Sequence, residues 1–195
     1  MSTVKNVTQP SRRKKREHEA AVQIRDVLAS SFPHYVVETG KSLLYKIEVD
    51  PSGQLSHEGT ASPMRGKYAF QTDILISKGV TPLVVIELKA DSFSSHDVIN
   101  YSSKAARHKQ IYPYLRYGFV VAGLHGLGRR LMTHNEAFDF ALVLPDAAAI
   151  ENDLVALARR QIKAAETLCE LMRSNRTKIV RYEQTVHIDQ LSAVL

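Results

Sequence analysis

The sequence predicts a single mixed α/β domain. The length of 195 residues suits one domain of ordinary size. Segments of helical and strand periodicity alternate in the order α–β–β–β–α–β–β–α–β, a pattern typical of this class. Hydrophobic residues make up 44% and charged residues 24%, which is enough apolar surface for a core. No apolar run is long enough to span a bilayer, so we expect no membrane partner.

The N-terminal segment is polar and basic, and we expect residues 1–16 to be a flexible tail before one domain over residues 17–195. Its run RRKKR is a solvated helix start, an arm that contacts phosphates or, as a third alternative, a nuclear localisation signal. The second of these makes Arg12 and Arg13 candidate DNA contacts. Apolar residues then recur at three- and four-residue steps, which predicts a helix that ends before Pro33.

The rest of the chain divides into strands and helices by periodicity, proline and glycine. We expect one or two strands in residues 35–50, a turn at 50–53 and a loop over 54–66 long enough to contact a partner. The later elements are two strands of a hairpin (67–76 and 82–90), a loop and a helix (92–112), two strands (117–123 and 137–145), a long helix (149–175) and a closing strand (178–188). The long helix carries a heptad-like apolar stripe, which packs either on the sheet or on a second subunit.

Charged residues stand in the otherwise apolar hairpin. Strand alternation puts Glu87 and Lys89 on one face. A register that pairs Ser77 with Leu83 also places Asp73 opposite Glu87, with Cβ atoms about 5 Å apart. Two carboxylates so close in an apolar setting repel, so a cation is expected between them. That cation is either Lys89, in a structural ion pair, or a divalent metal, since carboxylates suit hard cations such as Mg²⁺.

The same residues resemble a known signature. Thr72-Asp73, thirteen further residues and then Glu87-Leu88-Lys89 are similar to the motif of the PD-(D/E)XK nuclease superfamily, with threonine in place of the proline. That superfamily includes many restriction endonucleases and several DNA-repair and recombination nucleases. The resemblance implies a restriction-endonuclease-like mixed β-sheet flanked by helices.

The resemblance also implies roles for single residues. Asp73, Glu87 and the carbonyl of Leu88 would hold Mg²⁺, and Lys89 would orient or help to deprotonate the attacking water. The family adds an acid from the preceding helix, for which Glu17 and Glu19 are the candidates. We favour Glu17 because it lies on the apolar line of its helix, although an acid there could instead serve the helix dipole.

Cationic residues elsewhere suggest where DNA would bind. The formal charge of +6 favours an anionic partner. Further candidate contacts lie on the helix after the hairpin and in a glycine-rich loop: Lys104, Arg107, Lys109, Arg129 and Arg130. For the cations on the helix, the alternative is an ordinary solvated face.

The leading expectation is therefore a Mg²⁺-dependent DNA endonuclease of the restriction type, without a small-molecule cofactor. A symmetric cut in duplex DNA needs two sites, so we expect a homodimer. The single cysteine, Cys169, fits a cytoplasmic protein. The alternatives are a repair or junction-cleaving nuclease, a non-catalytic DNA-binding module of the same fold, and a basic protein whose Asp-Glu-Lys trio is structural.

Overall fold

A mixed five-stranded sheet forms the centre of the protein. The computed structural model describes residues 12–56, 63, 68–174, 176 and 178–189. Its strands lie in the order β1 (Val36–Thr39), β4 (Ile74–Lys78), β5 (Thr81–Ala90), β6 (Arg116–Ala122) and β7 (Phe140–Leu144). The pairs β1–β4 and β4–β5 are antiparallel, and the pairs β5–β6 and β6–β7 are parallel. The prediction of a mixed α/β class is thus confirmed.

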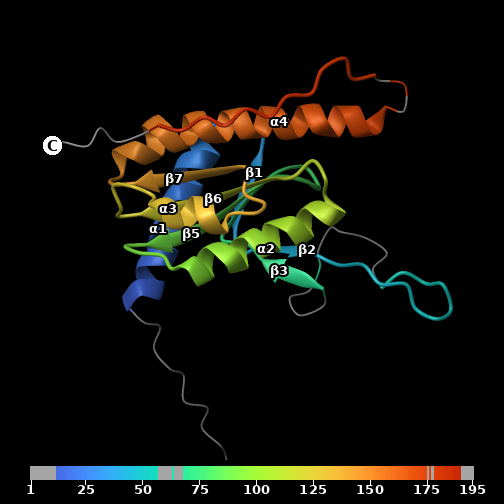
Figure 1. Cartoon of the computed structure of the whole chain (residues 1–195), viewed down its shortest axis with the longest axis horizontal. Helices are drawn as coiled ribbons and strands as arrows, with labels where there is room; N and C mark the ends of the chain where they lie inside the picture. The colour runs from blue at the N-terminus through green and yellow to red at the C-terminus, as the bar shows by residue number, and fades with distance from the viewer. Residues whose placement is uncertain (1–11, 57–62, 64–67, 175, 177, 190–195) are drawn as a thin grey trace, which may run out of the picture.

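Helices cover both faces of this sheet (Figure 1). One face packs against α1 (Arg12–Ser31), the π-helical turn η1 (Ile150–Leu154) and α4 (Val155–Arg173). The other face carries α2 (Ser95–Ile111), α3 (Arg129–His134) and a small sheet of β2 (Ser42–Leu44) and β3 (Ala69–Gln71). Alternation in β5 divides its side chains between the two faces: Ile86 and Leu88 face α1 and α4, whereas Val85 faces α2.

The apolar stripe of α4 packs on the sheet of its own chain. Its residues Ala158, Ile162, Ala165 and Cys169 are buried in the same core cluster as the sheet residues. Of the two expectations for this stripe, packing on the sheet is confirmed. Because that face is covered, it does not provide a dimer interface.

The first helix begins earlier than predicted. Residues 12–16, expected to belong to a flexible tail, are the first turns of α1. Arginine and lysine are good helix formers, and the pairs Arg13–Glu17 and Lys15–Glu19 stand four residues apart on this helix. Residues 1–11 of the predicted tail lie outside the described residues.

The stretch predicted as one strand over 67–76 contains two. β3 pairs with β2 in the small sheet, and β4 pairs with β1 and β5 in the large one. The chain changes sheets at Thr72 and Asp73, where Thr72 donates hydrogen bonds to the carbonyl of Lys41 from both its N–H and its hydroxyl. Most of the predicted long loop over 54–66 lies outside the described residues, namely residues 57–62 and 64–66.

The predicted closing strand over 178–188 is wrong. These residues have no regular secondary structure, and their apolar side chains are exposed, Val180 and Tyr182 among them. A strand forms only where a neighbour satisfies its backbone groups, and the alternating sequence does not show whether a sheet edge lies within reach.

Arg129 and Arg130 also differ from expectation, because they begin α3 instead of lying in a loop. None of the described helices is both long and apolar enough to cross a membrane.

Candidate active site

The register of β4 and β5 brings two carboxylates together. Ile74 pairs with Ile86, so the next residues outward, Asp73 and Glu87, stand opposite each other. The backbone N–H of Leu88 donates to Oδ2 of Asp73 over 2.7 Å, which fixes the Asp73 carboxylate against β5. The predicted apposition of Asp73 and Glu87 is therefore present in the structure.

The far end of the same hairpin does not follow the predicted register. Ser77 pairs with Pro82 and not with Leu83, because the ladder shifts by one residue between Ile76 and Ser77. A bulge of this kind inserts one residue on one strand and leaves the pairing on its other side unchanged. The shift lies on the turn side of the hairpin, so the pairing beside the carboxylates keeps the predicted register.

Glu87 is the buried member of the pair, with 1% of its surface exposed. The hydroxyl of Tyr117 in β6 donates to Oε1 of Glu87 over 2.6 Å, and Nζ of Lys104 in α2 lies 3.7 Å from the same atom. Burial, and next the negative charge of Asp73, raise the pKa of Glu87 to about 8, against the opposing effects of Lys104 and Tyr117. An additional cation at this pair would relieve the repulsion.

Lys89 lies on the same face, two residues along β5, and is held by two further carboxylates. Its Nζ is 3.5 Å from Oε1 of Glu17 and 3.6 Å from Oδ1 of Asp97, and its side chain is 14% exposed. The candidate helix acids are thereby distinguished, because Glu17 reaches Lys89, whereas Glu19 is 61% exposed and pairs with Lys15. A lysine held between two acids has its ammonium group fixed in place.

Asp97 belongs to the N-terminus of α2 and was not anticipated from the sequence. It is the third helical residue of a capping box, in which Asp97 N–H donates to Ser94 Oγ and the Asp97 carboxylate accepts from Ser94 N–H. Burial acts to raise the pKa of Asp97, but the hydrogen bonds from Ser94 and the charge of Lys89 outweigh it and lower the pKa. One carboxylate thus both caps α2 and holds Lys89.

The donor set fits a hard divalent cation with few protein ligands. Asp73 and Glu87 supply carboxylate oxygens, and the backbone of Leu88 adjoins Asp73. Within the described part of the chain, no three His, Cys, Asp or Glu side chains form a group that could hold a metal ion. Glu17, the nearby third acid, is bound by Arg13 and Lys89. Two carboxylates and open positions for water suit Mg²⁺, which keeps several waters when bound to proteins.

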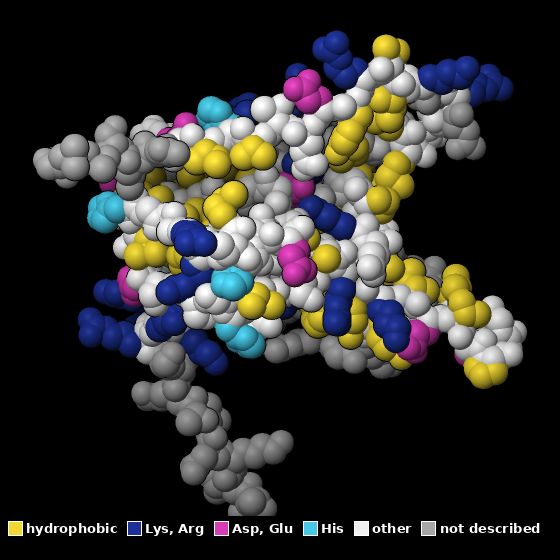
Figure 2. All heavy atoms as spheres, in the orientation of Figure 1, with side chains coloured by type: hydrophobic (Ala, Val, Ile, Leu, Met, Phe, Trp, Pro, Cys, Tyr) yellow, Lys and Arg dark blue, Asp and Glu magenta, His cyan; other side chains and the backbone are white. Residues whose placement is uncertain are grey.

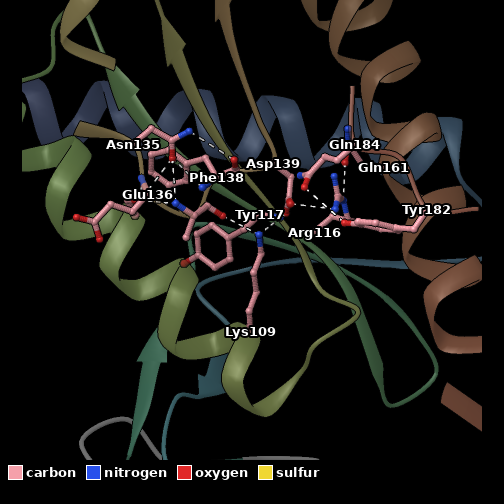
Figure 3. Close-up of polar contacts among 12 residues, drawn as sticks. Lys109, Arg116, Tyr117, Asn135, Glu136, Phe138, Asp139, Gln161, Tyr182 and Gln184 are labelled. Carbon is pink, nitrogen blue, oxygen red and sulfur yellow. Dashed lines mark hydrogen bonds and ion pairs between the residues drawn. The ribbon is translucent and has the colours of Figure 1, made fainter. Parts of the chain in front are cut away.

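The cations predicted to contact DNA have different environments. Lys104 borders the site, whereas Arg12, Arg107 and Arg129 are exposed on the surface. Lys109 instead points towards Asp139 at 2.8 Å and donates to the carbonyl of Ala137 over 2.6 Å (Figure 3).

The Lys109 contact belongs to a structural network. Arg116 binds the other oxygen of Asp139 over 2.9 Å, and the Tyr117 N–H donates to the same carboxylate. Burial lowers the pKa of Lys109 against the effect of Asp139. This network ties the end of α2 to β6 and β7, so Lys109 is occupied within the protein.

Two more of the predicted DNA contacts hold the loop between β5 and α2. Arg13 donates to the carbonyl of Ser92 over 2.6 Å, and Arg130 donates to that of Phe93 over 2.8 Å. A third arginine, Arg16, binds Asp91 in the same loop over 2.7 Å. These side chains from α1 and α3 fix the short connection between Lys89 and the cap of α2.

Two aromatic residues of the site were also missed by the sequence reasoning. Tyr117 reads as an ordinary residue of an apolar strand, and Tyr101 as one residue of a mixed helix. Only the placement of β6 and α2 beside β5 brings them to the carboxylates. Asp97 did carry a local signal, because Ser94 and Asp97 have the spacing of a capping box.

Comparison with known proteins gives no family for this chain. No protein-family model matches the sequence, and no curated protein matches it either.

Proposed function

We propose that this protein is a Mg²⁺-dependent DNA endonuclease of the restriction-endonuclease-like type, which hydrolyses phosphodiester bonds. The observation that carries the proposal is the apposition of Asp73 and Glu87, with Lys89 on the same face of β5. In a purely structural core, a second facing carboxylate would only destabilise the fold. In a nuclease site, the two carboxylates would bind a divalent cation and the lysine would contact the phosphate.

The metal would be held by Asp73, Glu87 and the carbonyl of Leu88. When bound, Mg²⁺ supplies an activated water and neutralises the charge that develops on the scissile phosphate. The buried Tyr117 hydroxyl fixes Oε1 of Glu87, and the Leu88 N–H fixes Oδ2 of Asp73. The second oxygen of each carboxylate takes no part in these two bonds and would be the atom that binds the cation.

Lys89 would orient the attacking water and donate hydrogen bonds to an oxygen of the scissile phosphate. The positive charge of its ammonium stabilises the developing negative charge, as preorganised donors do in other hydrolytic sites. Glu17 and Asp97 hold the ammonium near this position before substrate arrives. Water adds to phosphorus, the bond to the leaving oxygen breaks, and a terminal phosphate and a hydroxyl remain.

The architecture supports a restriction-endonuclease-like fold without defining it. The expected elements follow one another along the chain: α1 with its acid, the β4–β5 hairpin with the motif, and α2 after it. The parallel strand β6 then lies beside β5 and supplies Tyr117 to the site. The five strands flanked by helices on both faces agree with this arrangement.

A restriction-type cut through both strands requires a second copy of the site, so we propose a homodimer whose interface lies away from the buried stripe of α4. The proposed partner is DNA, in line with the net charge of +6. The lone cysteine is buried, which agrees with a cytoplasmic location.

Plasmid cleavage tests the proposal. Supercoiled DNA is incubated with the wild-type protein and with Lys89→Ala, each with Mg²⁺ or with a chelator. Cutting by the wild type only in Mg²⁺, reduced at least about a hundredfold in the variant, supports a nuclease. If the wild type binds DNA and cuts none, the chain is a non-catalytic DNA-binding module. If Lys89→Ala cuts as fast as the wild type, Asp73, Glu87 and Lys89 are a structural cluster and not the active site.

A further inference from the structure

A row of alternating cationic and aromatic side chains leads away from Lys89 towards the small sheet. Nζ of Lys89 lies 5.2 Å from the ring centroid of Tyr101, and Nζ of Lys104 lies 4.8 Å from the same centroid. Lys104 also lies 5.8 Å from the ring of Phe70, which stacks on Tyr45 with centroids 3.9 Å apart. With Arg107, 5.8 Å from the Tyr45 ring, these residues form what we term the cation–aromatic row: Lys89, Tyr101, Lys104, Phe70, Tyr45 and Arg107.

The row is built from β5, which carries Lys89, from α2, from β3, and from Tyr45 directly after β2. Tyr101, Lys104 and Arg107 follow at three-residue steps on α2, so they are neighbours on one face of the helix. Phe70 comes from β3, opposite Leu43 of β2. The small sheet is anchored to α2, because Leu43, Leu44 and Ala69 share a core cluster with Ala105 of that helix.

The outer end of the row is positively charged. At its inner end, Lys89 and Lys104 are paired with carboxylates of the site. Arg107 is exposed, and in the part of the chain that the structure describes no carboxylate pairs with it. The rings of Tyr45 and Phe70 are only half-buried. Figure 2 shows Lys and Arg side chains beside hydrophobic ones over β3 and the adjoining end of α2.

We propose that the cation–aromatic row binds unpaired nucleotides of a DNA strand that enters or leaves the candidate site. The inference rests on the proposed nuclease function and adds a substrate class, which is DNA with a single-stranded segment next to the scissile phosphate. Flaps, splayed ends and junctions have this form. The row thereby favours the repair or junction-cleaving alternative over the restriction-type cut.

Unpaired bases fit this surface better than a duplex does. Cations spaced along a groove follow the phosphates of either form. Aromatic rings add binding energy only where a base can present its face, and in a duplex the neighbouring base pairs cover those faces. Half-buried Tyr45 and Phe70 between Lys104 and Arg107 therefore discriminate in favour of unpaired bases.

Fluorescence anisotropy in a chelating buffer tests the proposal without cleavage. The probes are a labelled single strand of about 20 nucleotides, the matching blunt duplex, and a duplex with a single-stranded flap. The wild type is expected to bind the single strand and the flap at least about tenfold more tightly than the blunt duplex. Equal affinity for all three probes would overturn the proposal.

Matched variants assign the preference to the row. Tyr45→Leu keeps an apolar side chain against Phe70 but removes the stacking face, and is expected to weaken single-strand binding at least about fivefold. The duplex affinity should change less than about twofold. Arg159→Ala is the control for Arg107→Ala, because Arg159 also lies over an aromatic ring, that of Phe32 at 5.2 Å, but on α4. Equal effects of Arg107→Ala and Arg159→Ala would contradict the assignment.

A second measurement uses only the wild-type protein, so it does not depend on whether the variants fold. A single strand containing 5-bromodeoxyuridine is cross-linked by ultraviolet light, and the modified peptides are identified by mass spectrometry. Cross-links at Tyr45, Phe70 or Tyr101 support the row, and cross-links confined to other elements overturn it. Single-strand binding without Mg²⁺-dependent cleavage of either the plasmid or the flap duplex would end the nuclease proposal and leave the row, whereas cleavage without this binding preference would do the reverse.

Discussion

The backbone N–H of Leu88 donates a hydrogen bond to the Asp73 carboxylate over 2.7 Å, although the two residues are 15 positions apart. This bond lies one step beyond the paired residues of β4 and β5. It holds the Asp73 carboxylate at the strand that carries the buried Glu87. Holding two carboxylates face to face therefore lowers the stability of the fold.

Removing the charge of Asp73 should therefore stabilise the metal-free protein. Asp73→Asn keeps an oxygen that can accept from Leu88 and removes the charge that helps to raise the pKa of Glu87, so we expect the free energy of unfolding near pH 7 to rise by about 1 kcal/mol. Asp73→Ala also removes this charge but leaves the Leu88 N–H without its acceptor, which costs about 1 kcal/mol. Urea denaturation with a chelator present measures both, and an Asp73→Asn variant less stable than the wild type would contradict this account.

Asp97 should position Lys89 for the reaction, apart from its role in capping α2. Asp97→Asn retains an acceptor for Ser94 but loses the charge beside Lys89, and the single-turnover cleavage rate should fall about tenfold. Asp97→Glu keeps a carboxylate at a position where glutamate also completes a capping box, so it should restore most of the rate.

Ser94→Ala is the control for that prediction. It should lower the free energy of unfolding by about 1 kcal/mol and leave the cleavage rate nearly unchanged. Equal losses of rate in Ser94→Ala and Asp97→Asn would mean that Asp97 serves only the helix cap.

His108 should make the fold sensitive to acid. It is fully buried on α2, with Nε2 3.2 Å from the carbonyl of Leu43, and burial lowers its pKa to about 4. The unfolded chain takes up this proton below about pH 6.5 and the folded chain only below about pH 4, so the free energy of unfolding falls as the pH falls between these values. The total loss is about 3 kcal/mol.

Denaturation between about pH 4 and pH 7 compares the wild type with His108→Gln, which keeps a donor for Leu43. The variant should show the weaker dependence on pH, and His18→Gln, at an exposed position of α1, should behave like the wild type. Identical slopes for all three proteins would show that His108 is not the group responsible.

Gly118 should not tolerate a side chain. A Cβ atom at this position of β6 would lie 2.1 Å from the ring of Phe140 in β7, too close for the packed core to accept. Gly118→Ala is expected to lower the free energy of unfolding by about 2 kcal/mol. Gly128→Ala is the control, since a Cβ there meets nothing within 4 Å. Thermal unfolding of the two variants should separate them, and equal midpoints would refute the predicted clash.

Local patterns predicted much of the fold and part of the site. Strand alternation placed Glu87 and Lys89 on one face, and the hairpin register placed Asp73 opposite Glu87, because both depend on residues close in sequence. The apolar line of α1 selected Glu17 over Glu19 for the same reason.

The missed features depend on which elements become neighbours in space. Tyr117 reaches Glu87 only because β6 lies parallel to β5, a pairing that no local pattern specifies. The sequence suggested that Lys109 is a surface cation because its acceptor, Asp139, lies thirty residues further along the chain. The segment 178–188 alternates like a strand, but alternation does not reveal whether a sheet edge is available.

Metal binding by Asp73 and Glu87 is the central claim, and a titration with Mn²⁺ tests it most directly. Mn²⁺ shares the preference of Mg²⁺ for carboxylate oxygens, and its free form is measured by electron paramagnetic resonance. The wild type should bind Mn²⁺, Asp73→Asn at least about tenfold more weakly, and Glu38→Gln, which removes an acid from the neighbouring β1, with wild-type affinity. Equal affinity of the wild type and Asp73→Asn would contradict the claim.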